Sequence, residues 1–189
     1  QKVIEDTSVP RADSRIVAKD GTVVDRAFGI GNFDVSEDGN VIAFVGLGYS
    51  DPNNYYGVAR KAEVFLYEGG AIRQLTNDDP WTGKDHVVVS GDGHTVVFSN
   101  AKNWLAYHRD SGQMLPIEVS TFNFGGVDLS RDGAKMFYQD AGANGGRLVY
   151  TDGSGRLDLM PGVGVGLPLA ALAYASIGAR GDRVAFLFE

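Results

Sequence analysis

A short pattern that recurs along the chain constrains the fold more than any other feature. It reads FDVSEDGNVIAF at residues 33–44, VVVSGDGHTVVF at 87–98 and VDLSRDGAKMFY at 127–138, with a weaker copy, SIGARGDRVAF, at 176–186. Asp-Gly between alternating apolar residues predicts a β-hairpin, because the turn requires a positive φ, which glycine adopts without steric cost. The sequence therefore predicts a series of antiparallel hairpins.

The spacing of the hairpins predicts their assembly. The turn glycines, Gly39, Gly93, Gly133 and Gly181, are separated by 54, 40 and 48 residues. Repeats of this length with four strands each are typical of β-propeller blades. The strands expected in the first three repeats are 33–36, 41–45, 62–67 and 71–76; 86–90, 95–99, 104–109 and 114–119; and 126–130, 135–139, 147–151 and 156–160.

The two ends of the chain complement each other in this pattern. RIVAKDGTVV at 15–24 aligns with the third and fourth strands of a blade, and the strands expected at 173–177 and 183–188 align with the first two. Joined, they would complete a blade and leave no exposed strand edge. The prediction is an all-β propeller of four blades, each of four antiparallel strands, closed by N- and C-terminal strands that share one blade. The alternative is an excised part of a larger propeller.

The domain organisation follows from the same pattern. Residues 15–189 are expected to form a single propeller domain, and residues 1–14, which have no clear period, an N-terminal extension. The connection at 163–175 fits the pattern poorly, and a helical turn is expected at 169–175. The chain begins at Gln1 rather than Met, so we expect a processed protein or a module of a larger chain. As a separate chain it is expected to be a monomer.

Composition excludes several classes of function. The net charge is −7 and no cluster of lysine and arginine occurs, which disfavours nucleic-acid binding. The chain has no cysteine, so it has neither disulfides nor thiolate metal sites. No apolar run approaches the roughly 20 residues that a membrane helix requires, so no membrane insertion is expected.

The repeat resembles that of a known family. The pattern V-S-x-D-G-x-x-V-x-F, followed by a third strand and AIRQLTND at 71–78, is similar to the WD-like repeat of TolB-type bacterial propellers. The weaker copy departs from it at Arg180, which replaces the turn aspartate. The resemblance implies a propeller scaffold for protein or peptide binding in a bacterial protein located outside the cytoplasm, either periplasmic, on the cell surface or secreted.

The repeated polar residues have a structural interpretation. Ser36 and Asp38 recur as equivalent pairs in the second and third copies, where a short side chain beside a turn hydrogen-bonds nearby backbone. His86 and His94 are expected toward opposite faces, because the turns after the first and third strands share one face and the other connections share the opposite face. No catalytic histidine cluster is therefore expected.

Two oxygen-rich segments are candidate metal sites. DPNN at 51–54 and NDD at 77–79 offer oxygen ligands, but neither has the spacing of an EF-hand. The sequence therefore predicts no cofactor, with calcium as the alternative.

Aromatic residues gather in the connections expected on one face. Aromatic side chains in loops often mark binding sites, because tyrosine and tryptophan combine a large contact area with a polar tip. The predicted ligand-binding residues are Tyr49, Asn53, Asn54, Tyr55, Tyr56, Trp81, Lys84, Asp85, Asn103, Trp104, Phe122 and Phe124. The alternative for the aromatic residues is packing between blades.

The sequence favours a non-enzymatic recognition module that binds a peptide or protein segment through this face. The first alternative is a carbohydrate-binding module, with the aromatic rings as stacking platforms for a glycan. The second is a hydrolase or lyase that uses funnel carboxylates, with Asp51, Asp79 and Asp85 as candidates.

Overall fold

The structure is a computed structural model of the whole chain. It describes the backbone of residues 2–6, 13–17, 19, 21, 23–24, 30–49, 60–77, 84, 86–100, 103–117, 127–140, 147–151, 156–158 and 172–188. Side chains are described at 19, 21, 32–46, 62–77, 84, 86–100, 103–117, 127–138, 151 and 176–185.

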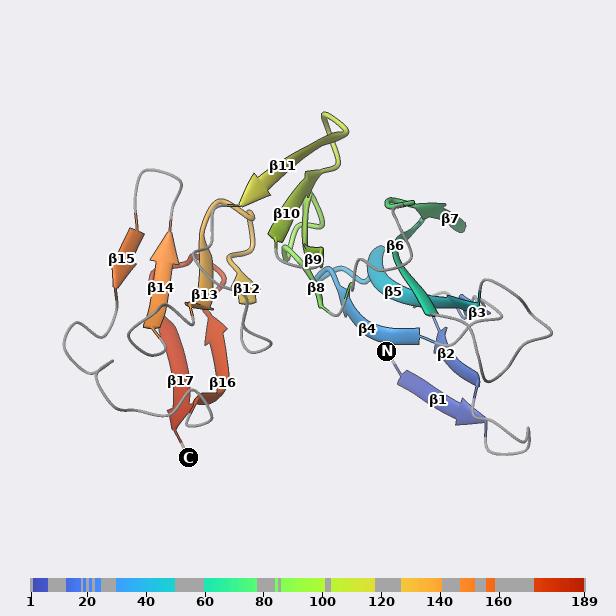
Figure 1. Cartoon of the computed structure of the whole chain (residues 1–189), viewed down its shortest axis with the longest axis horizontal. Coiled ribbons are helices and arrows are strands. Elements are labelled where there is room, and N and C mark those ends of the chain that lie inside the picture. Colours follow the sequence, from blue (N-terminus) through green and yellow to red (C-terminus); the bar gives the residue numbers. More distant parts are fainter. Residues whose placement is uncertain are drawn as a thin grey trace.

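The described chain is built from β-strands arranged in an arch (Figure 1). The strands are β1 (Lys2–Asp6), β2 (Asp13–Val17), β3 (Val23–Val24), β4 (Ile30–Val35), β5 (Val41–Tyr49), β6 (Arg60–Glu68), β7 (Ala71–Gln74), β8 (Val87–Val89), β9 (Thr95–Asn100), β10 (Asn103–His108), β11 (Gln113–Ile117), β12 (Val127–Leu129), β13 (Met136–Asp140), β14 (Arg147–Thr151), β15 (Arg156–Asp158), β16 (Leu172–Ile177) and β17 (Val184–Phe188).

Three four-stranded antiparallel sheets confirm the three complete repeats. Their strand orders are β4-β5-β6-β7, β8-β9-β10-β11 and β12-β13-β14-β15, so each strand pairs with its neighbours in sequence. We call these sheets blades 1, 2 and 3. The first strands, β4, β8 and β12, lie against one another in succession, and β12 also lies against β16. The last strands, β7, β11 and β15, lie on the outside of the arch (Figure 1).

The two ends of the chain do not share a blade in this structure. The strands β1, β2 and β3 form one sheet and β16 and β17 another, and Figure 1 places these sheets at opposite ends of the arch. The prediction of a ring of four blades closed by shared strands therefore does not hold for the described strands. The physical reason is β1, which lies within the segment expected to be an extension. It pairs with β2 from Lys2–Val17 to Asp6–Asp13, and so occupies the edge that β17 would have needed.

The turn chemistry predicted from the repeats is confirmed. Gly39, Gly93, Gly133 and Gly181 all have positive φ angles, between 64° and 75°. In blade 1 the Ser36 hydroxyl donates to the Asp38 carboxylate at 2.6 Å and accepts from the Val41 amide at 3.0 Å. The equivalent bonds occur at Ser90–Asp92 and Ser130–Asp132. Serine and aspartate therefore stabilise the hairpins.

The hydrophobic core lies between the sheets. The cluster between blades 1 and 2 consists of Val41, Ala43, Val45, Val64, Leu66, Val87, Val89, Val96, Phe98 and Tyr107. The cluster between blades 2 and 3 consists of Val97, Trp104, Ala106, Leu129, Met136 and Tyr138. Alternate residues of each strand thus face the blade before and the blade after, which is why the second strands are nearly continuous apolar runs.

The local structure near the C-terminal end of the chain differs from the expected one. The helical turn expected at 169–175 is wrong over its last four residues, because β16 begins at Leu172 and pairs with β17. Pairing with β17 has overridden the helix propensity of the leucine and alanine residues in this segment. Within the described residues, no helix is long and apolar enough to cross a membrane.

Candidate functional site

One face of the arch is formed by the turns between the first and second strands of each blade. The Glu37 amide donates to the Gly91 carbonyl oxygen at 2.8 Å, the Asp92 amide to the Arg131 carbonyl oxygen at 2.8 Å, and the Arg131 amide to the Ala179 carbonyl oxygen at 2.8 Å. Backbone hydrogen bonds therefore join consecutive turns along the arch. We call this surface the turn face.

Charged side chains reinforce the turn face. Arg131 pairs with Glu37 at 3.2 Å and thereby links blade 3 to blade 1 across the turn of blade 2. Arg109, from the turn after β10, donates to the Gly93 carbonyl oxygen at 2.7 Å and pairs with Glu68. The two kinds of turn therefore share one face, as the sequence predicted. Its backbone groups and several of its charges are already used within the fold.

The turn glycines also fit closely against the preceding blade. A Cβ added to Gly133 would lie 2.6 Å from the Thr95 Oγ1 atom and 2.7 Å from its Cβ. A Cβ on Gly93 would lie 2.9 Å from the Val41 Cγ2 atom. These glycines are required both for their φ angles and for the approach of adjacent blades.

The first strands carry side chains that bind the backbone of the next blade. Asn32 accepts a hydrogen bond from the Val87 amide at 3.0 Å, and Asp34 accepts one from the Val89 amide at 2.8 Å. Asp128 accepts from the Ile177 amide at 2.8 Å. Carboxylates of the first strands therefore hold the next blade.

The first strand of blade 2 breaks this pattern. The position of Asp34 and Asp128 is taken in β8 by Val88, which packs on the cluster between blades 2 and 3. The amide of Leu129, which a carboxylate at position 88 would have bound, instead donates to Oδ1 of the adjacent Asp128 at 2.8 Å. Asp128 therefore satisfies an amide on its own strand and one on β16.

The carboxylate of Asp34 has an altered acidity. Burial raises its pKa, and the carboxylate of Asp128 adds to this effect. Hydrogen bonds from the amides of Val89 and Val35 act in the opposite direction. The carboxylates of Asp34 and Asp128 thus interact electrostatically, but both also accept hydrogen bonds from the next blade.

A buried ionic network lies at the other side of blade 1. Lys84, which is 1% exposed, places its Nζ 3.5 Å from Oε2 of Glu63 on β6. The same carboxylate accepts a hydrogen bond from the Thr76 hydroxyl, whose oxygen accepts one from the Val64 amide at 2.9 Å. This network attaches Lys84, which precedes β8, to the sheet of blade 1.

The hairpins that connect the second and third strands differ in length. In blade 1, β5 and β6 are each 9 residues long and pair as far as Tyr49 with Arg60. In blade 2, β9 and β10 are 6 residues long and end at the pair Asn100–Asn103. The blade 1 hairpin extends three residues further, about 10 Å at 3.4 Å per residue. We call the part of β5 and β6 beyond Gly46–Glu63 the blade 1 arm.

Close packing supports the base of this arm. The ring of Phe65 stacks on that of Phe44 with centroids 5.4 Å apart. It also covers Gly46, where an added Cβ would lie 2.6 Å from the ring. The base of the arm is therefore closely packed.

Four of the predicted ligand-binding residues lie in described parts of the chain. Tyr49 is the last residue of β5, and the side chain of Asn103 is exposed at the start of β10. Lys84 is buried against Glu63, and Trp104 is 4% exposed, with its ring 6.3 Å from that of His86. The side chains of Lys84 and Trp104 thus contribute to the interior. The other predicted residues, Asn53, Asn54, Tyr55, Tyr56, Trp81, Asp85, Phe122 and Phe124, lie outside the described residues.

The described residues provide neither a metal site nor the carboxylates proposed for the enzyme alternative. No group of three or more His, Asp or Glu side chains in the described part of the chain is arranged to hold a metal ion. The candidate carboxylates Asp51, Asp79 and Asp85, and both oxygen-rich tips at 51–54 and 78–79, lie outside it. His94 contacts Asp110 at 2.8 Å on the turn face, whereas His86 lies beside Trp104.

No protein-family model matches the chain, and no curated protein matches it in sequence. Solved structures do match its fold. TolB from Acinetobacter baumannii aligns with a TM-score of 0.67 and 14% identity over 99% of this chain and 46% of the TolB chain. Dipeptidyl peptidase 4 from Porphyromonas gingivalis aligns at 0.58 and 15%, over 93% of this chain and 33% of that one.

A third match comes from the structure of a nidogen–laminin complex, at a TM-score of 0.58 and 11% identity over 94% of this chain and 66% of that one. The chain therefore spans less than half of the TolB chain that it matches. At this level of identity the likeness shows the fold. Together with three consecutive four-stranded blades, it shows that this chain has a TolB-like β-propeller fold.

Proposed function

We propose that the chain is a non-enzymatic recognition module that binds a peptide or protein segment on the face opposite the turn face. The blade 1 arm is the observation that carries this proposal. It extends beyond the corresponding hairpin of blade 2 and ends at Tyr49, and the proposed binding residues Tyr55 and Tyr56 follow in the sequence between β5 and β6. A projecting loop on a rigid base is a common position for binding residues.

The turn face is a poorer choice for the same role. Its amides and carbonyl groups bind one another from blade to blade, and Arg131 and Arg109 are paired with carboxylates. A ligand there would have to replace these contacts, at the cost of leaving polar groups unpaired. We assign the predicted aromatic loop residues to the opposite face, where the exposed side chain of Asn103 can donate and accept hydrogen bonds from a peptide backbone.

The comparisons support the general class of function. The nidogen–laminin structure is a complex between proteins, and propellers serve many functions through the loops that they carry. We further propose a location outside the cytoplasm, in the periplasm or at the surface of a bacterium. The open arc, and the share of the TolB chain that it spans, support the alternative architecture in which these blades form part of a larger ring.

A display selection tests the proposal directly. The immobilised chain is used to select from a random peptide library, and the enriched peptide is then titrated against Tyr55→Ala and Tyr56→Ala variants. We expect each substitution to weaken binding about tenfold, because aromatic anchors commonly contribute more than 1 kcal/mol. Arg131→Gln on the turn face is the matched control and should bind as the parent does.

Two results would contradict the proposal. One is a selection that enriches no peptide; the other is binding that both tyrosine variants retain in full. A glycan array incubated with the same protein distinguishes the carbohydrate alternative, since binding there that Tyr55→Ala abolishes would assign the arm to a glycan instead.

A further inference from the structure

Arg73, on the outer strand of blade 1, is held in place by Tyr107, and among the described residues no carboxylate neutralises its charge. Its Nη2 donates to the Tyr107 hydroxyl at 2.6 Å, and its guanidinium carbon lies 5.1 Å from the centre of the Tyr107 ring. Arg109, Arg131 and Arg180 each pair with a carboxylate. Among the described residues Arg73 has no such partner, although its side chain is exposed and the chain is acidic overall.

The fixed position of Arg73 makes it suited to bind an anion. Tyr107 is 4% exposed, so the group that orients the guanidinium is itself held in the core. Arginine has five N–H donors in a planar fork, and only one is used by Tyr107. The remaining donors can bind a carboxylate through two parallel hydrogen bonds, with little loss of side-chain freedom.

The outer strand of blade 2 has an unusual exposure of apolar residues. Met114 is 38% exposed and Leu115 is 47% exposed, and they are the large hydrophobic side chains exposed within the described residues. Consecutive residues of a strand point to opposite faces of the sheet. Both faces of β11 are therefore open, and β11 pairs with β10 alone in the described sheet. An exposed strand edge of this kind is a template for another strand.

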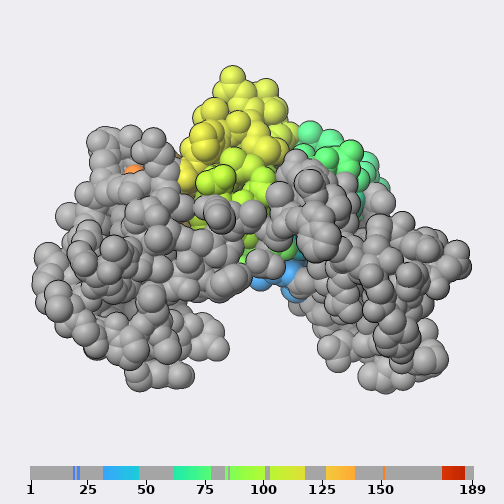
Figure 2. Space-filling model, in the orientation of Figure 1, coloured from blue at the N-terminus to red at the C-terminus, as the bar shows by residue number. Residues whose placement is uncertain are grey.

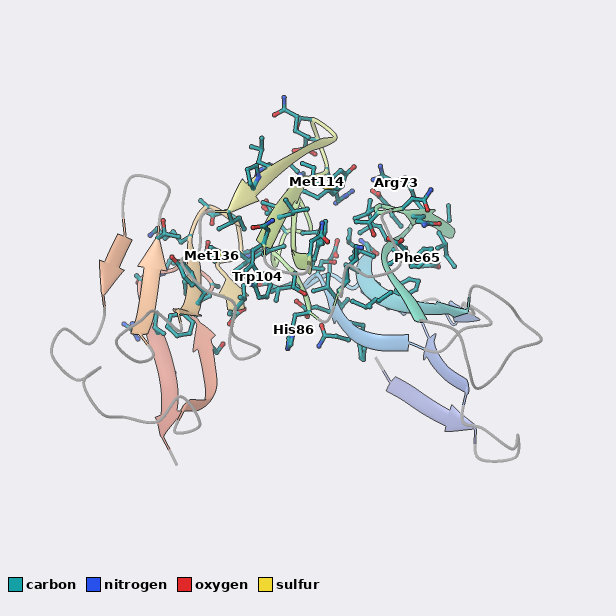
Figure 3. All side chains as sticks on the ribbon, in the orientation of Figure 1. Phe65, Arg73, His86, Trp104, Met114 and Met136 are labelled. Atoms are coloured by element: carbon teal, nitrogen blue, oxygen red, sulfur yellow. The ribbon has the colours of Figure 1, made fainter. Side chains whose placement is uncertain are left out.

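Strand register places Arg73 and Met114 on facing surfaces. Arg73 lies opposite Leu66 in the β6–β7 pair, and Met114 lies opposite Tyr107 in the β10–β11 pair. Directly opposed residues share a face, and both Leu66 and Tyr107 belong to the cluster between blades 1 and 2. Figure 3 labels Arg73 on β7 and Met114 on β11, both toward the outer side of the arch, and Figure 2 shows the projecting β10–β11 hairpin in yellow-green beside β6–β7 in green.

We propose that this outer rim, formed by Arg73, Tyr107, Met114 and Leu115, is a second binding site, whose ligand is an extended peptide segment with alternating acidic and apolar side chains. The segment adds by main-chain hydrogen bonds to the edge of β11 that is unpaired in the described sheet, a known mode of peptide recognition. Its acidic side chains lie on the Met114 face and reach Arg73, and its apolar side chains cover Leu115. Pro116 has no amide hydrogen and limits the paired stretch to a few residues.

Methionine methyl signals give a direct readout of this site. The chain is labelled with ¹³C-methyl methionine and titrated with a blocked peptide of alternating valine and aspartate. We expect the Met114 signal to move, whereas that of Met136, which is 7% exposed in the neighbouring cluster, stays in place. Raising the salt from about 0.05 to 0.5 M should weaken binding, because the contact with Arg73 is ionic and exposed.

Substitutions separate the charge of Arg73 from its placement. Arg73→Gln should weaken binding at least about tenfold, which corresponds to about 1.4 kcal/mol. Tyr107→Phe keeps the ring and the charge but removes the hydroxyl that orients the guanidinium, so a smaller, several-fold loss is expected. Arg183→Gln, an exposed arginine on the turn before β17, is the matched control and should bind as the parent does. An unchanged Met136 signal verifies the fold of each variant.

Three outcomes would overturn the proposal: no movement of the Met114 signal, equal binding of the peptide with asparagine in place of aspartate, or unchanged binding by Arg73→Gln. The site is independent of the blade 1 arm. Tyr55→Ala and Tyr56→Ala should leave it intact, so its failure and the failure of the arm as a binding site are distinguishable.

Discussion

The contact between adjacent turns can be measured by comparing two glycines that share a backbone conformation. Gly133 has a φ of 66° and Gly112 a φ of 68°, so alanine at either position pays a similar backbone cost of about 1–2 kcal/mol. Around Gly112 no heavy atom lies within 4 Å of an added Cβ. At Gly133 the Cβ would lie 2.6 and 2.7 Å from atoms of Thr95, and 3.2 Å from the Cβ of Ser90.

Neither neighbour of Gly133 can move freely. Thr95 is 6% exposed, Ser90 is fully buried, and the Ser90 hydroxyl accepts the Thr95 amide at 2.9 Å. Overpacking of such a site costs about 1–3 kcal/mol beyond the backbone term. We therefore expect Gly133→Ala to lose about 2–5 kcal/mol of unfolding free energy, and Gly112→Ala about 1–2 kcal/mol.

Urea unfolding followed by tryptophan fluorescence measures both losses. With a slope of about 2 kcal/mol per M, a difference of about 2 kcal/mol between the variants separates their midpoints by about 1 M. Equal midpoints for Gly133→Ala and Gly112→Ala would refute the reasoning, because the two positions differ only in the approach of the neighbouring blade.

Other contacts give further expectations, all measurable by the same unfolding assay. Burial raises the pKa of Asp34 in the folded state. Its stabilising contribution is therefore complete below the unfolded value of 3.8 and is lost as the pH rises through the folded pKa. The stability of Asp34→Asn relative to the parent should increase as the pH rises above about 4, and a constant difference would contradict this. Lys84→Met should lower the free energy of unfolding by about 3–5 kcal/mol, because it leaves Glu63 buried without its ammonium partner. Combining Lys84→Met with Glu63→Leu should recover part of that loss. A double variant less stable than the single one would argue against a buried ion pair. Gly91→Ala should cost less than about 1 kcal/mol, because its φ is not positive and its Cβ meets only the long, exposed side chains of Glu37 and Arg131. A loss as large as that of Gly133→Ala would show that the ion pair between these two side chains is rigid.

The repeat itself could be predicted because its signals are local. A turn glycine, the serine and aspartate beside it and the flanking apolar residues act within one hairpin, and all three full copies fold as expected. The strand expected at 147–151 has the same bounds as β14. The weaker copy keeps its turn despite Arg180, because the bonds from the Gly178 amide to Arg183 and from the Gly181 amide to Gly178 need no side chain.

The arrangement of the ends could not be predicted in the same way. Lys2–Asp6 alternates weakly and carries two acidic residues and a lysine, so its apolar pattern does not identify it as a strand. It becomes one by pairing with β2, and this choice between two candidate partners for the same edge depends on distant residues. The register of a strand is visible in its own sequence, whereas the identity of its neighbour is not.

Only part of the candidate site could be predicted from the sequence. Lys84 and Trp104 have the residue types of a binding surface, but buried partners, Glu63 and the cluster around Met136, draw them inward. Arg73 could not be identified from the sequence, because its contact with Tyr107 joins residues 34 positions apart in adjacent blades. An available signal was the run Met114–Leu115, two adjacent apolar residues on an outer strand where one of them must face solvent.

The bonds between successive turns also determine how the molecule opens. Each blade is held mainly by the one before and the one after it. Its protection from hydrogen exchange therefore depends on the stability of its neighbours, as in other linear repeat proteins. Blade 2 is flanked on both sides, whereas the sheets at the two extremities of the arch each have a single neighbour in the described structure. Amide hydrogen exchange should therefore be fastest at β1–β3 and β16–β17 and slowest at β8 and β9, and partial unfolding should advance inward from the termini.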